Sequence, residues 1–402
     1  MHKIKPMSIE VIKSKAAEIL PELIAIRRRI HKNPELSFQE FNTQILIEDY
    51  LQNKLNLKTK RLANTGVVAL IEGKNPSKKV VGLRADMDAL PIVEVNDGRP
   101  YRSENEGVMH ACGHDVHTTS LLGAATILSE LKDEFEGTIK LVFQPGEERL
   151  PGGASLMIAD GVLNDPKVDI MIGQHVFPMI YTGGVGFRSG LYMASTDEIY
   201  ITVKGKGGHG AMPYLTIDPV LITSHMIVAL QQVVSRIANP VTPSVLSFGK
   251  VIAMGATNVI PSEVKIEGTF RTLNEEWRAE AHRRIIEIAE GVVRGMGGEI
   301  EIDIRRGYPF LMNDPSVTEI SNRAAKNFLG SENVHDLEIW MAAEDFAYYS
   351  QEVPSCFYRL GTRNDDKGTT FSVHHPSFDV DEQSLETGAS LMAFLAIEHL
   401  KD

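Results

Sequence analysis

Cysteine is scarce in this chain, and lysine and arginine never gather into a basic run. Only two cysteines, Cys112 and Cys356, occur among 402 residues, which excludes a scaffold held together by several disulfides. A single Cys112–Cys356 bridge is allowed by this count, but a reducing cytoplasm fits it better. The formal net charge is -12, so a nucleic acid or another polyanion is not an expected partner.

Long hydrophobic runs are absent as well. No window approaches the roughly 18 uninterrupted apolar residues that a membrane-spanning helix needs. Residues 1–6 lead into an amphipathic stretch with interspersed charges rather than into an apolar core and a cleavage site, so no signal peptide is expected. These absences predict a cytoplasmic protein without a membrane partner. Because 43% of the 402 residues are hydrophobic, the chain can build one large domain or two medium ones.

The most informative feature that is present is the stretch Met109–His117. It holds one thiol, Cys112, and the imidazoles of His110, His114 and His117. Thiolate and neutral imidazole are the ligands that borderline-soft divalent metals prefer. Cys112 and His114 are two residues apart, too close to share a helix face, so they fit a loop that leads into the apolar, helix-forming run that follows. The alternative is a helix start that is polar for no functional reason.

Further metal-competent side chains follow short apolar runs. Residues 79–84, 138–143 and 168–174 have the continuous hydrophobicity typical of strands buried on both faces. Open α/β sheets place their sites at the carboxyl ends of such strands. Together with the Cys112 loop, the side chains found there predict a hydrolase site with one or two metal ions. They are Asp86 and Asp88 after the first run, Glu147 and Glu148 after the second, and His175 after the third. His374 and His375 add to this set from a different setting, before a helical pattern that starts near Asp381.

The adjacent carboxylates Glu147 and Glu148 match what amide hydrolysis requires. A divalent metal lowers the pKa of a bound water to about 7, and a second group must carry the proton to the leaving nitrogen. One carboxylate as a metal ligand and one as general acid and base would supply both functions, although the two positions do not reveal which is which. An acidic helix start, favoured by the helix dipole, is the alternative.

The histidines and aspartates of these segments also admit structural explanations. His175 could be a buried histidine of purely structural role, and of the pair His374 and His375 at most one is expected to bind the same ion. Of Asp86 and Asp88, one is expected to point inward and orient a metal-binding histidine, while the other caps a helix or faces solvent.

The order of predicted elements divides the chain into two domains. Helical patterns cover residues 9–31 and 38–55, and the alternation with strands that follows is typical of a mainly parallel, helix-covered sheet. Between about residues 198 and 305 the predicted order is strand, helix, strand, strand, helix, strand, a split βαβ unit of the ferredoxin-like type. We therefore predict an α/β protein whose catalytic, metal-binding domain is discontinuous (residues 1–189 and 309–402), with an inserted α+β domain (residues 190–308).

The insertion contains a cluster of its own at Gly205–Pro213. Its glycines permit close backbone approach and expose His209 at a strand end, where the imidazole can donate a hydrogen bond to a developing oxyanion. A flexible hairpin tip is the alternative. Asn258 and Arg271 are candidates for binding a substrate carboxylate, a task that suits the planar guanidinium of arginine. Either could instead be an ordinary turn residue or a surface charge.

Taken together, the motifs resemble those of the aminoacylase/carboxypeptidase metallopeptidases, and within them the amidohydrolase branch. That branch includes hippurate hydrolases, indole-acetyl-amino-acid hydrolases and N-acetyl-diaminopimelate deacetylases. The resemblance runs in order from about Ile26 to Ala396. The strings that carry it are LRADMDALP, HACGHDVHT, FQPGEE, GQHV, GKGGHGAMP, TNVIP, AEDFAYY and HHPSF.

The resemblance implies a site with two divalent metal ions in each subunit, with zinc, manganese, cobalt and nickel all left open. Cys112 would bridge the ions in the place that an aspartate holds in related branches. His114 and His175 would complete the shell of one ion, and Glu148 and His374 that of the other.

Roles for the remaining residues are implied in the same way. Glu147 would be the general base that activates the bridging water and then protonates the amine, with Asp88 as the supporting carboxylate. In this family the small domain dimerises, and His209 would reach into the active site of the partner subunit. Asn258 and Arg271 would engage the carboxylate of the substrate, and Glu344 would lie near the metals without an assigned role.

The resemblance therefore implies a metal-dependent amidohydrolase that removes a small acyl or aryl-acyl group from an N-acyl amino acid with a free carboxylate. A homodimer or homotetramer is expected. Three different functions are also compatible with the residues. They are a carboxypeptidase or dipeptidase acting on peptide bonds, a non-catalytic metal-bound scaffold in which Glu147 is dispensable, and a cysteine hydrolase that uses Cys112 as its nucleophile.

Overall fold

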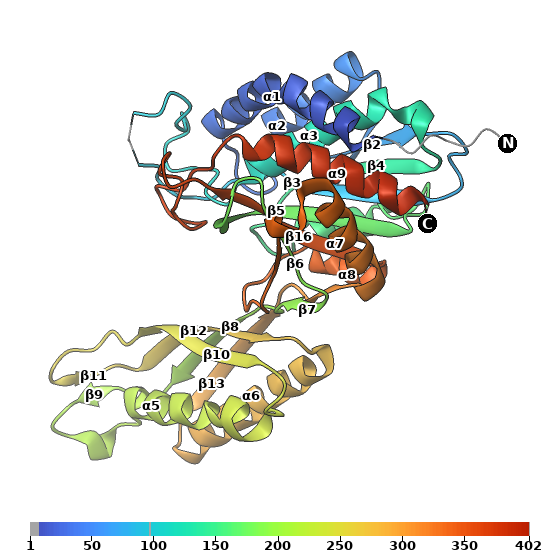
Figure 1. The fold of residues 1–402 in the computed structure, drawn as a ribbon. Coiled ribbons are helices and arrows are strands. Elements are labelled where there is room, and N and C mark those ends of the chain that lie inside the picture. Colours follow the sequence, from blue (N-terminus) through green and yellow to red (C-terminus); the bar gives the residue numbers. More distant parts are fainter. Residues whose placement is uncertain (1–7, 96–97, 402) are drawn as a thin grey trace. The chain divides into compact units, whose positions relative to one another are not determined.

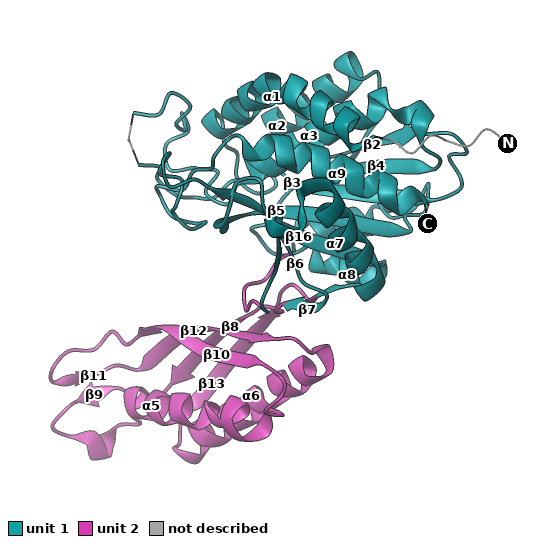
Figure 2. Ribbon diagram, viewed as in Figure 1, with its two compact units in different colours: residues 1–192, 312–339, 345–402 teal, residues 193–311, 340–344 magenta. Residues whose placement is uncertain are grey.

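The computed structural model describes residues 8–95 and 98–401, which form two compact units (Figures 1 and 2). As far as they are described, Met1–Tyr192, Met312–Ile339 and Asp345–Asp402 form unit 1, and Met193–Leu311 and Trp340–Glu344 form unit 2. The boundaries expected from the sequence differ from these mainly in the short segment Trp340–Glu344. The prediction that there is no signal peptide rests partly on residues 1–6. Residues 1–7 lie outside the described residues.

Unit 1 is built on an eight-stranded sheet. In order across the sheet, the strands are β1 (Thr59–Leu62), β2 (Gly66–Glu72), β4 (Thr138–Gln144), β3 (Val80–Asp86), β5 (Ile170–Tyr181), β16 (Ser355–Arg363), β6 (Val185–Phe187) and β15 (Val334–Asp336). The central pairs β4–β3, β3–β5 and β5–β16 are parallel, whereas β1 and β2 are added in antiparallel orientation at one edge. The predicted mainly parallel sheet is confirmed.

Helices cover this sheet. Every residue of β3 and β4 is buried, as expected for strands that pack on both faces. Three helices, α1 (Ile9–Lys32), α3 (His114–Glu130) and α9 (Ser384–Lys401), pack against one another (Figure 1). The others are α2 (Phe41–Asp49) beside β2, α7 (Pro315–Leu329) against α9 and β16, and α4 (Gly153–Ala159) and α8 (Ala347–Glu352), which contact each other and the sheet.

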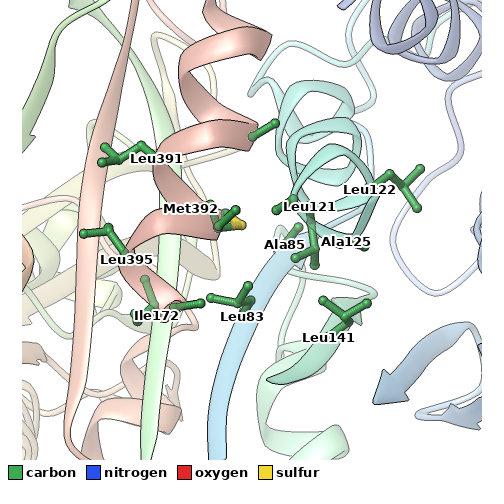
Figure 3. Close-up of a cluster of buried hydrophobic side chains, with 14 of the residues drawn as sticks. Leu83, Ala85, Leu121, Leu122, Ala125, Leu141, Ile172, Leu391, Met392 and Leu395 are labelled. Atoms are coloured by element: carbon green, nitrogen blue, oxygen red, sulfur yellow. The ribbon is translucent and has the colours of Figure 1, made fainter. Parts of the chain in front are cut away.

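The main core of unit 1 lies between α3, α9 and the centre of the sheet (Figure 3). Residues His114–Leu128 of α3 are all buried, and from Leu121 to Leu128 the helix is mostly apolar, as expected of a helix enclosed on all sides. Each leucine enclosed here contributes about 1.5–3 kcal/mol through the hydrophobic effect. The side chains that meet are Leu83, Ala85, Leu141 and Ile172 from the strands, Leu121, Leu122 and Ala125 from α3, and Leu391, Met392 and Leu395 from α9.

Unit 2 has the ferredoxin-like order of elements. Along the chain these are β8 (Asp197–Lys204), α5 (Pro219–Leu230), β10 (Ser244–Ile252), β12 (Glu263–Thr272), α6 (Glu275–Gly295) and β13 (Glu299–Arg306), and the antiparallel sheet has the order β10-β12-β8-β13. Buried and half-buried residues alternate along β8, as in a strand with one face on the core. A separate pair, β9 (Gly208–His209) and β11 (Val259–Ile260), carries the glycine-rich cluster.

Two elements differ from the sequence-based expectation. The helix expected over residues 38–55 begins only at Phe41, because Phe38 has a φ of 66°, a left-handed conformation that a helix does not allow. The strand expected to end before His175 runs through it to Tyr181. His175 therefore lies within a strand rather than after one.

One helical stretch among the described residues, Pro219–Ile237, is long and apolar enough to cross a membrane, with a mean hydropathy of 1.4. Length and composition alone do not separate a membrane span from the helix of a folded domain. In unit 2 this stretch is α5 and the turn that follows it, and α5 packs against α6 and the sheet. Its buried share is 28%, so an apolar surface remains uncovered within the unit.

Candidate metal centre

Cys112 lies in the loop that leads into α3. Gly113 follows it with a φ of +80°, and a Cβ at this position would lie 2.5 Å from Cγ2 of Val176, so the tight turn requires glycine. His114 then begins the helix. Both side chains are enclosed by the fold, Cys112 with 7% exposure and His114 with 1%. The turn thus brings a thiol and an imidazole into the same buried space.

The hydrogen bonds of His175 and His114 determine which ring nitrogen is free to bind a metal. His175 Nδ1 lies 2.7 Å from the backbone oxygen of Val176; because a carbonyl only accepts, Nδ1 carries the proton and Nε2 keeps its lone pair. That Nε2 lies 3.3 Å from the Cys112 sulfur. His114 Nδ1 lies 3.2 Å from Asp88 Oδ1, so this histidine also donates through Nδ1. Metal-binding histidines are typically oriented in this way.

A second group of donors contacts the same sulfur. His374 Nε2 lies 3.3 Å from Cys112 Sγ and 3.2 Å from Glu148 Oε1. The backbone of His374 has a φ of 65°, an uncommon value for a residue with a side chain, and its N–H donates to the Ala111 oxygen at 2.7 Å. The ring of His375 instead stacks on a neighbouring phenylalanine. Of the two histidines, His374 is the one that faces the sulfur.

Two groups of donors therefore share one sulfur atom. They are Cys112, His114 and His175, and Cys112, Glu148 and His374, and within each group the donor atoms lie within 4.8 Å of one another. Among the described residues, His114 Nε2 and Glu148 Oε1 find no hydrogen-bond partner although they are buried, which is unusual for polar atoms. Sulfur, imidazole and carboxylate together form a donor set for zinc and similar ions. These residues fit a pair of divalent metals.

Electrostatics at the centre also favours cations. Burial raises the pKa of the Cys112 thiol, and the carboxylates of Glu148 and Glu147 raise it further. Without positive charge beside it, this sulfur stays protonated. Burial lowers the pKa of His114, but nearby carboxylates, Asp86 foremost, outweigh burial and raise it to about 10. The charges that surround both groups therefore call for compensation by cations.

His117, the last imidazole of the motif, is not free to bind a metal. Its Nε2 accepts the N–H of Val176 at 2.8 Å, so its proton is on Nδ1, which donates to Asp86 Oδ1 at 2.5 Å. Asp86 is fully buried and also accepts from Arg84 Nη1 at 2.6 Å. The expectation that one of Asp86 and Asp88 caps a helix or faces solvent is therefore wrong. Both point inward, because Arg84 neutralises the additional buried charge.

Glu147 and Glu148 follow Gly146 in the loop after β4. Gly146 has a φ of +58°, and a Cβ there would lie 2.3 Å from a phenylalanine ring, so the loop is built around glycine. Glu147 is 6% exposed, and its Oε1 accepts the N–H of Asp345 at 3.3 Å. Its carboxylate lies within 4.8 Å of the donor atoms of His114 and Glu148. Glu147 thus lies beside the first group of donors, and Glu148 lies within the second.

Unit 2 holds the remaining predicted residues. The pairing of β9 with β11 brings the backbone of Asn258 next to the end of β9, where His209 is exposed. His209 Nδ1 accepts the N–H of Ala211 at 3.0 Å, so its proton is on Nε2, which can donate to a ligand. Arg271 lies on β12, is half-buried and donates to the Met341 oxygen at 3.0 Å. Burial lowers the pKa of Arg271.

Two residues that support the centre were missed in the sequence, Arg84 and Asp345. Besides binding Asp86, Arg84 donates through Nη2 to Asp345 Oδ1 at 2.7 Å. The backbone of Asp345 in turn holds Glu147. An arginine inside an otherwise apolar strand indicates a buried pair, but the sequence does not identify a partner that lies 261 positions away.

Comparisons with known proteins extend over nearly the whole chain. Residues 82–398 match the family model described as Peptidase family M20/M25/M40. The chain is 40% identical over 365 residues to an N-acetyl-L-cysteine deacetylase from Bacillus subtilis, covering 90% of this chain and 85% of the relative. It is 39% identical over 394 residues to thermostable carboxypeptidase 2 from Saccharolobus solfataricus, covering 97% and 98%.

A solved structure shows the same architecture. It is a Bacillus subtilis protein described as a dinuclear metal binding peptidase from the M20 family, with a TM-score of 0.80 and 33% identity, covering 96% of this chain and 99% of that one.

Proposed function

This chain belongs to peptidase family M20/M25/M40 and is a hydrolase that acts on amide bonds, and from this premise we propose that it is a metal-dependent deacylase of N-acyl amino acids. The observation that carries the proposal is the Cys112 sulfur, which lies 3.3 Å from Nε2 of both His175 and His374. Candidate ligands from three distant segments meet there, and the lone pair of His175 Nε2 is available because Nδ1 of that ring donates to the Val176 oxygen.

The proposed centre holds two divalent ions, with zinc, manganese, cobalt and nickel as candidates. Such ions, when bound, lower the pKa of water to about 7 and polarise an acyl carbonyl. Their ligands would be Cys112, His114 and His175 for one ion and Cys112, Glu148 and His374 for the other, with Asp88 orienting His114.

Glu147 is proposed as the general base and acid. It is nearly buried, and the backbone of Asp345 holds one of its oxygens, so its position beside the donors is restricted. Glu147 accepts a proton from the attacking water and delivers it to the leaving nitrogen. The carbon–nitrogen bond breaks, and the products are a carboxylate and a free amino acid.

Substrate binding is assigned to unit 2 on the strength of the family resemblance. We propose that Arg271 and Asn258 bind the carboxylate of the amino acid, and that the Nε2–H of His209 stabilises the oxyanion from a partner subunit. The exposed apolar side chains of α5, with Val228 at 74% exposure, support a homodimer or homotetramer. Sedimentation of a monomer at micromolar concentration would contradict this assembly.

N-acyl amino acids and peptides are the two substrate classes to be separated. The chain is similar to an N-acetyl-L-cysteine deacetylase and almost equally to a carboxypeptidase. We expect kcat/KM to be higher for a panel of N-acetyl and N-benzoyl amino acids than for dipeptides of the same residues, each measured with manganese, cobalt or zinc. Higher values for the dipeptides would establish a carboxypeptidase or dipeptidase instead.

A cysteine hydrolase and a non-catalytic scaffold would behave differently from the proposed enzyme. A cysteine nucleophile needs a thiolate, whereas burial and the adjacent carboxylates raise the pKa of the Cys112 thiol. A cysteine hydrolase would survive EDTA; the proposed enzyme loses activity and recovers it when metal returns. A non-catalytic scaffold would hydrolyse no acyl amino acid with any of these metals. Free thiols at Cys112 and Cys356 support a cytoplasmic location, which cell fractionation tests.

A further inference from the structure

The segment Glu35–Glu40, which connects α1 to α2, reaches two of the loops that carry the metal centre. It precedes residue 82, where the match to the family model begins, and none of its side chains is a predicted ligand. Its backbone is attached to the loop after β3, because the N–H of Ala89 donates to the Glu35 oxygen at 2.8 Å. Two of its side chains extend from there toward the centre.

Ser37 binds the carboxylate that orients His114. The Ser37 hydroxyl donates to Asp88 Oδ2 at 2.6 Å, and the same oxygen accepts the backbone N–H of Glu148 at 3.0 Å. The other oxygen of Asp88 accepts from His114 Nδ1 at 3.2 Å. Ser37 and Asp88 are both buried. Ser37 therefore holds the Asp88 carboxylate, which accepts hydrogen bonds from His114 of the first donor group and from the backbone of Glu148 of the second.

Glu40 binds the loop that carries both catalytic-site glutamates. Its Oε1 accepts the backbone N–H of Gly146 at 2.8 Å, and its Oε2 accepts the Thr65 hydroxyl at 2.6 Å. The side chain is fully buried. The ring that fills the space where a Cβ of Gly146 would lie belongs to Phe38 of the same segment. Glu147 comes directly after Gly146, so the segment limits the loop both by a hydrogen bond and by contact.

We propose that Ser37 and Glu40 are positioning residues of the metal centre. Ser37 sets the orientation of Asp88, and through it the ring of His114 and the backbone of Glu148. Glu40 sets the loop that places Glu147 and Glu148. Partners behind metal ligands typically change metal affinity by about 10–100-fold when removed, because the ligands must be held to within a fraction of an ångström. The inference rests on the proposed metal centre but not on the proposed substrate.

The test is zinc binding by the full-length protein. Chelator-stripped wild type, Ser37→Ala and Glu40→Ala are titrated with Zn²⁺ by calorimetry, and the metal bound per chain is counted. We expect Kd to rise by about 10–100-fold in each variant. Burial and the charge of Asp88 raise the pKa of Glu40 to about 7, so a neutral side chain of the same shape is tolerated there. Glu40→Gln, whose amide oxygen can still accept the Gly146 N–H, should bind nearly as wild type.

A double-mutant cycle separates positioning from general weakening. Ser37 acts through Asp88, so Ser37→Ala should add little to the effect of Asp88→Asn. Glu40 bonds to Gly146 rather than to Asp88, but the charges of the two carboxylates interact, so this cycle tests the Ser37–Asp88 pair alone. If the effects of Ser37→Ala and Asp88→Asn on the Kd for zinc were additive, Ser37 would not act through Asp88, and the proposed role of Ser37 would be wrong.

The chain offers a matched control in Glu35. Its carboxylate accepts the backbone N–H groups of Asn42 and Thr43 at 3.0 and 2.9 Å, so it stabilises the start of α2 without touching the centre. Glu35→Ala should lower the melting temperature and leave the Kd for zinc unchanged. Equal losses of zinc affinity in Glu35→Ala and Ser37→Ala would show a merely structural segment and overturn the inference.

The other possible results of the zinc titrations also distinguish the proposed function from this inference. If wild type binds no metal, the proposed function and this inference are both wrong. If wild type binds a metal pair and both alanine variants bind it equally well, only the inference is wrong. Should Glu40→Ala fail to fold, Ser37→Ala, which removes a single hydroxyl, tests the proposal by itself.

Discussion

Asp197 in unit 2 and Glu148 in unit 1 both belong to buried clusters of ionisable side chains, but their oxygens are used differently. Asp197 is fully buried and accepts hydrogen bonds from Arg278 at 2.9 Å, from His282 at 2.7 Å and from the N–H of Gly307 at 3.2 Å. Glu148 Oε1 receives no well-formed hydrogen bond from the described part of the chain, although His374 Nε2 lies 3.2 Å from it.

The difference separates a structural cluster from a binding centre. A buried charge costs several kcal/mol unless a counter-charge and hydrogen bonds compensate it, and in unit 2 Arg278 provides both. In unit 1 the proposed ligands Cys112, His114 and Glu148 lie together, and of these three only His114, whose pKa is raised to about 10, can carry a positive charge, while Arg84 compensates Asp86 behind them. Under the proposed function, bound cations complete the centre of unit 1, whereas the cluster of unit 2 is complete within the chain.

The largest expected effect is on catalysis, in Glu147→Gln. Removing a general base and acid lowers kcat by about 10²–10⁴-fold, while the metal content stays at the wild-type level because Glu147 is not a proposed ligand. Steady-state kinetics and metal analysis on the same preparation measure both. Unchanged kcat with metal bound would show that Glu147 is dispensable and would support a non-catalytic scaffold.

Breaking the structural cluster should instead affect stability. Asp197→Ala leaves the Arg278 guanidinium buried without its main partner, and we expect a loss of about 3–5 kcal/mol in the free energy of unfolding, measured by denaturant titration. Metal content should not change. Cys112→Ala should have the opposite effects: the metal content should fall, and the free energy of unfolding of the metal-free protein should change little. If both variants lost metal, the two clusters would not be independent.

Chelation should distinguish the two clusters without any substitution. A ligand present at about 100 times its Kd stabilises the folded state by about 2.7 kcal/mol, so EDTA should lower the melting temperature of wild type by several degrees. The Asp197→Asn variant should show the same decrease. No change on chelation in wild type would argue against a metal centre.

The smallest effect is the pH dependence of the structural cluster. Burial by itself would raise the pKa of Asp197, but hydrogen bonds from His282 and Arg278 outweigh it and hold the pKa below its usual value. The contribution of Asp197 is therefore complete above the unfolded-state pKa of about 3.9 and is lost as pH falls through the lower folded-state pKa. The difference in melting temperature between wild type and Asp197→Asn should shrink below about pH 4. A difference that stays constant there would contradict this assignment.

Much of the fold could be predicted because its elements have strong periodicity. The buried strands β3 and β4 are continuous apolar runs, and the alternation along β8 indicates a strand with one face on the core. The late start of α2 was not predicted, because it depends on the left-handed backbone of Phe38, and this in turn accompanies the packing of its ring against Gly146. Contacts between segments decided that boundary.

The sequence by itself determined which atoms could bind metal, because sulfur, imidazole nitrogen and carboxylate oxygen are properties of the residue types, and their places after apolar strands indicated a common edge of the sheet. Only the tertiary structure decided how the ring nitrogens of His114, His117 and His175 are used. The backbone oxygen of Val176 accepts a hydrogen bond from Nδ1–H of His175, and the backbone N–H of Val176 donates to Nε2 of His117. Protonation follows from the nearest donor or acceptor in space, and the fold brings those partners from distant parts of the chain.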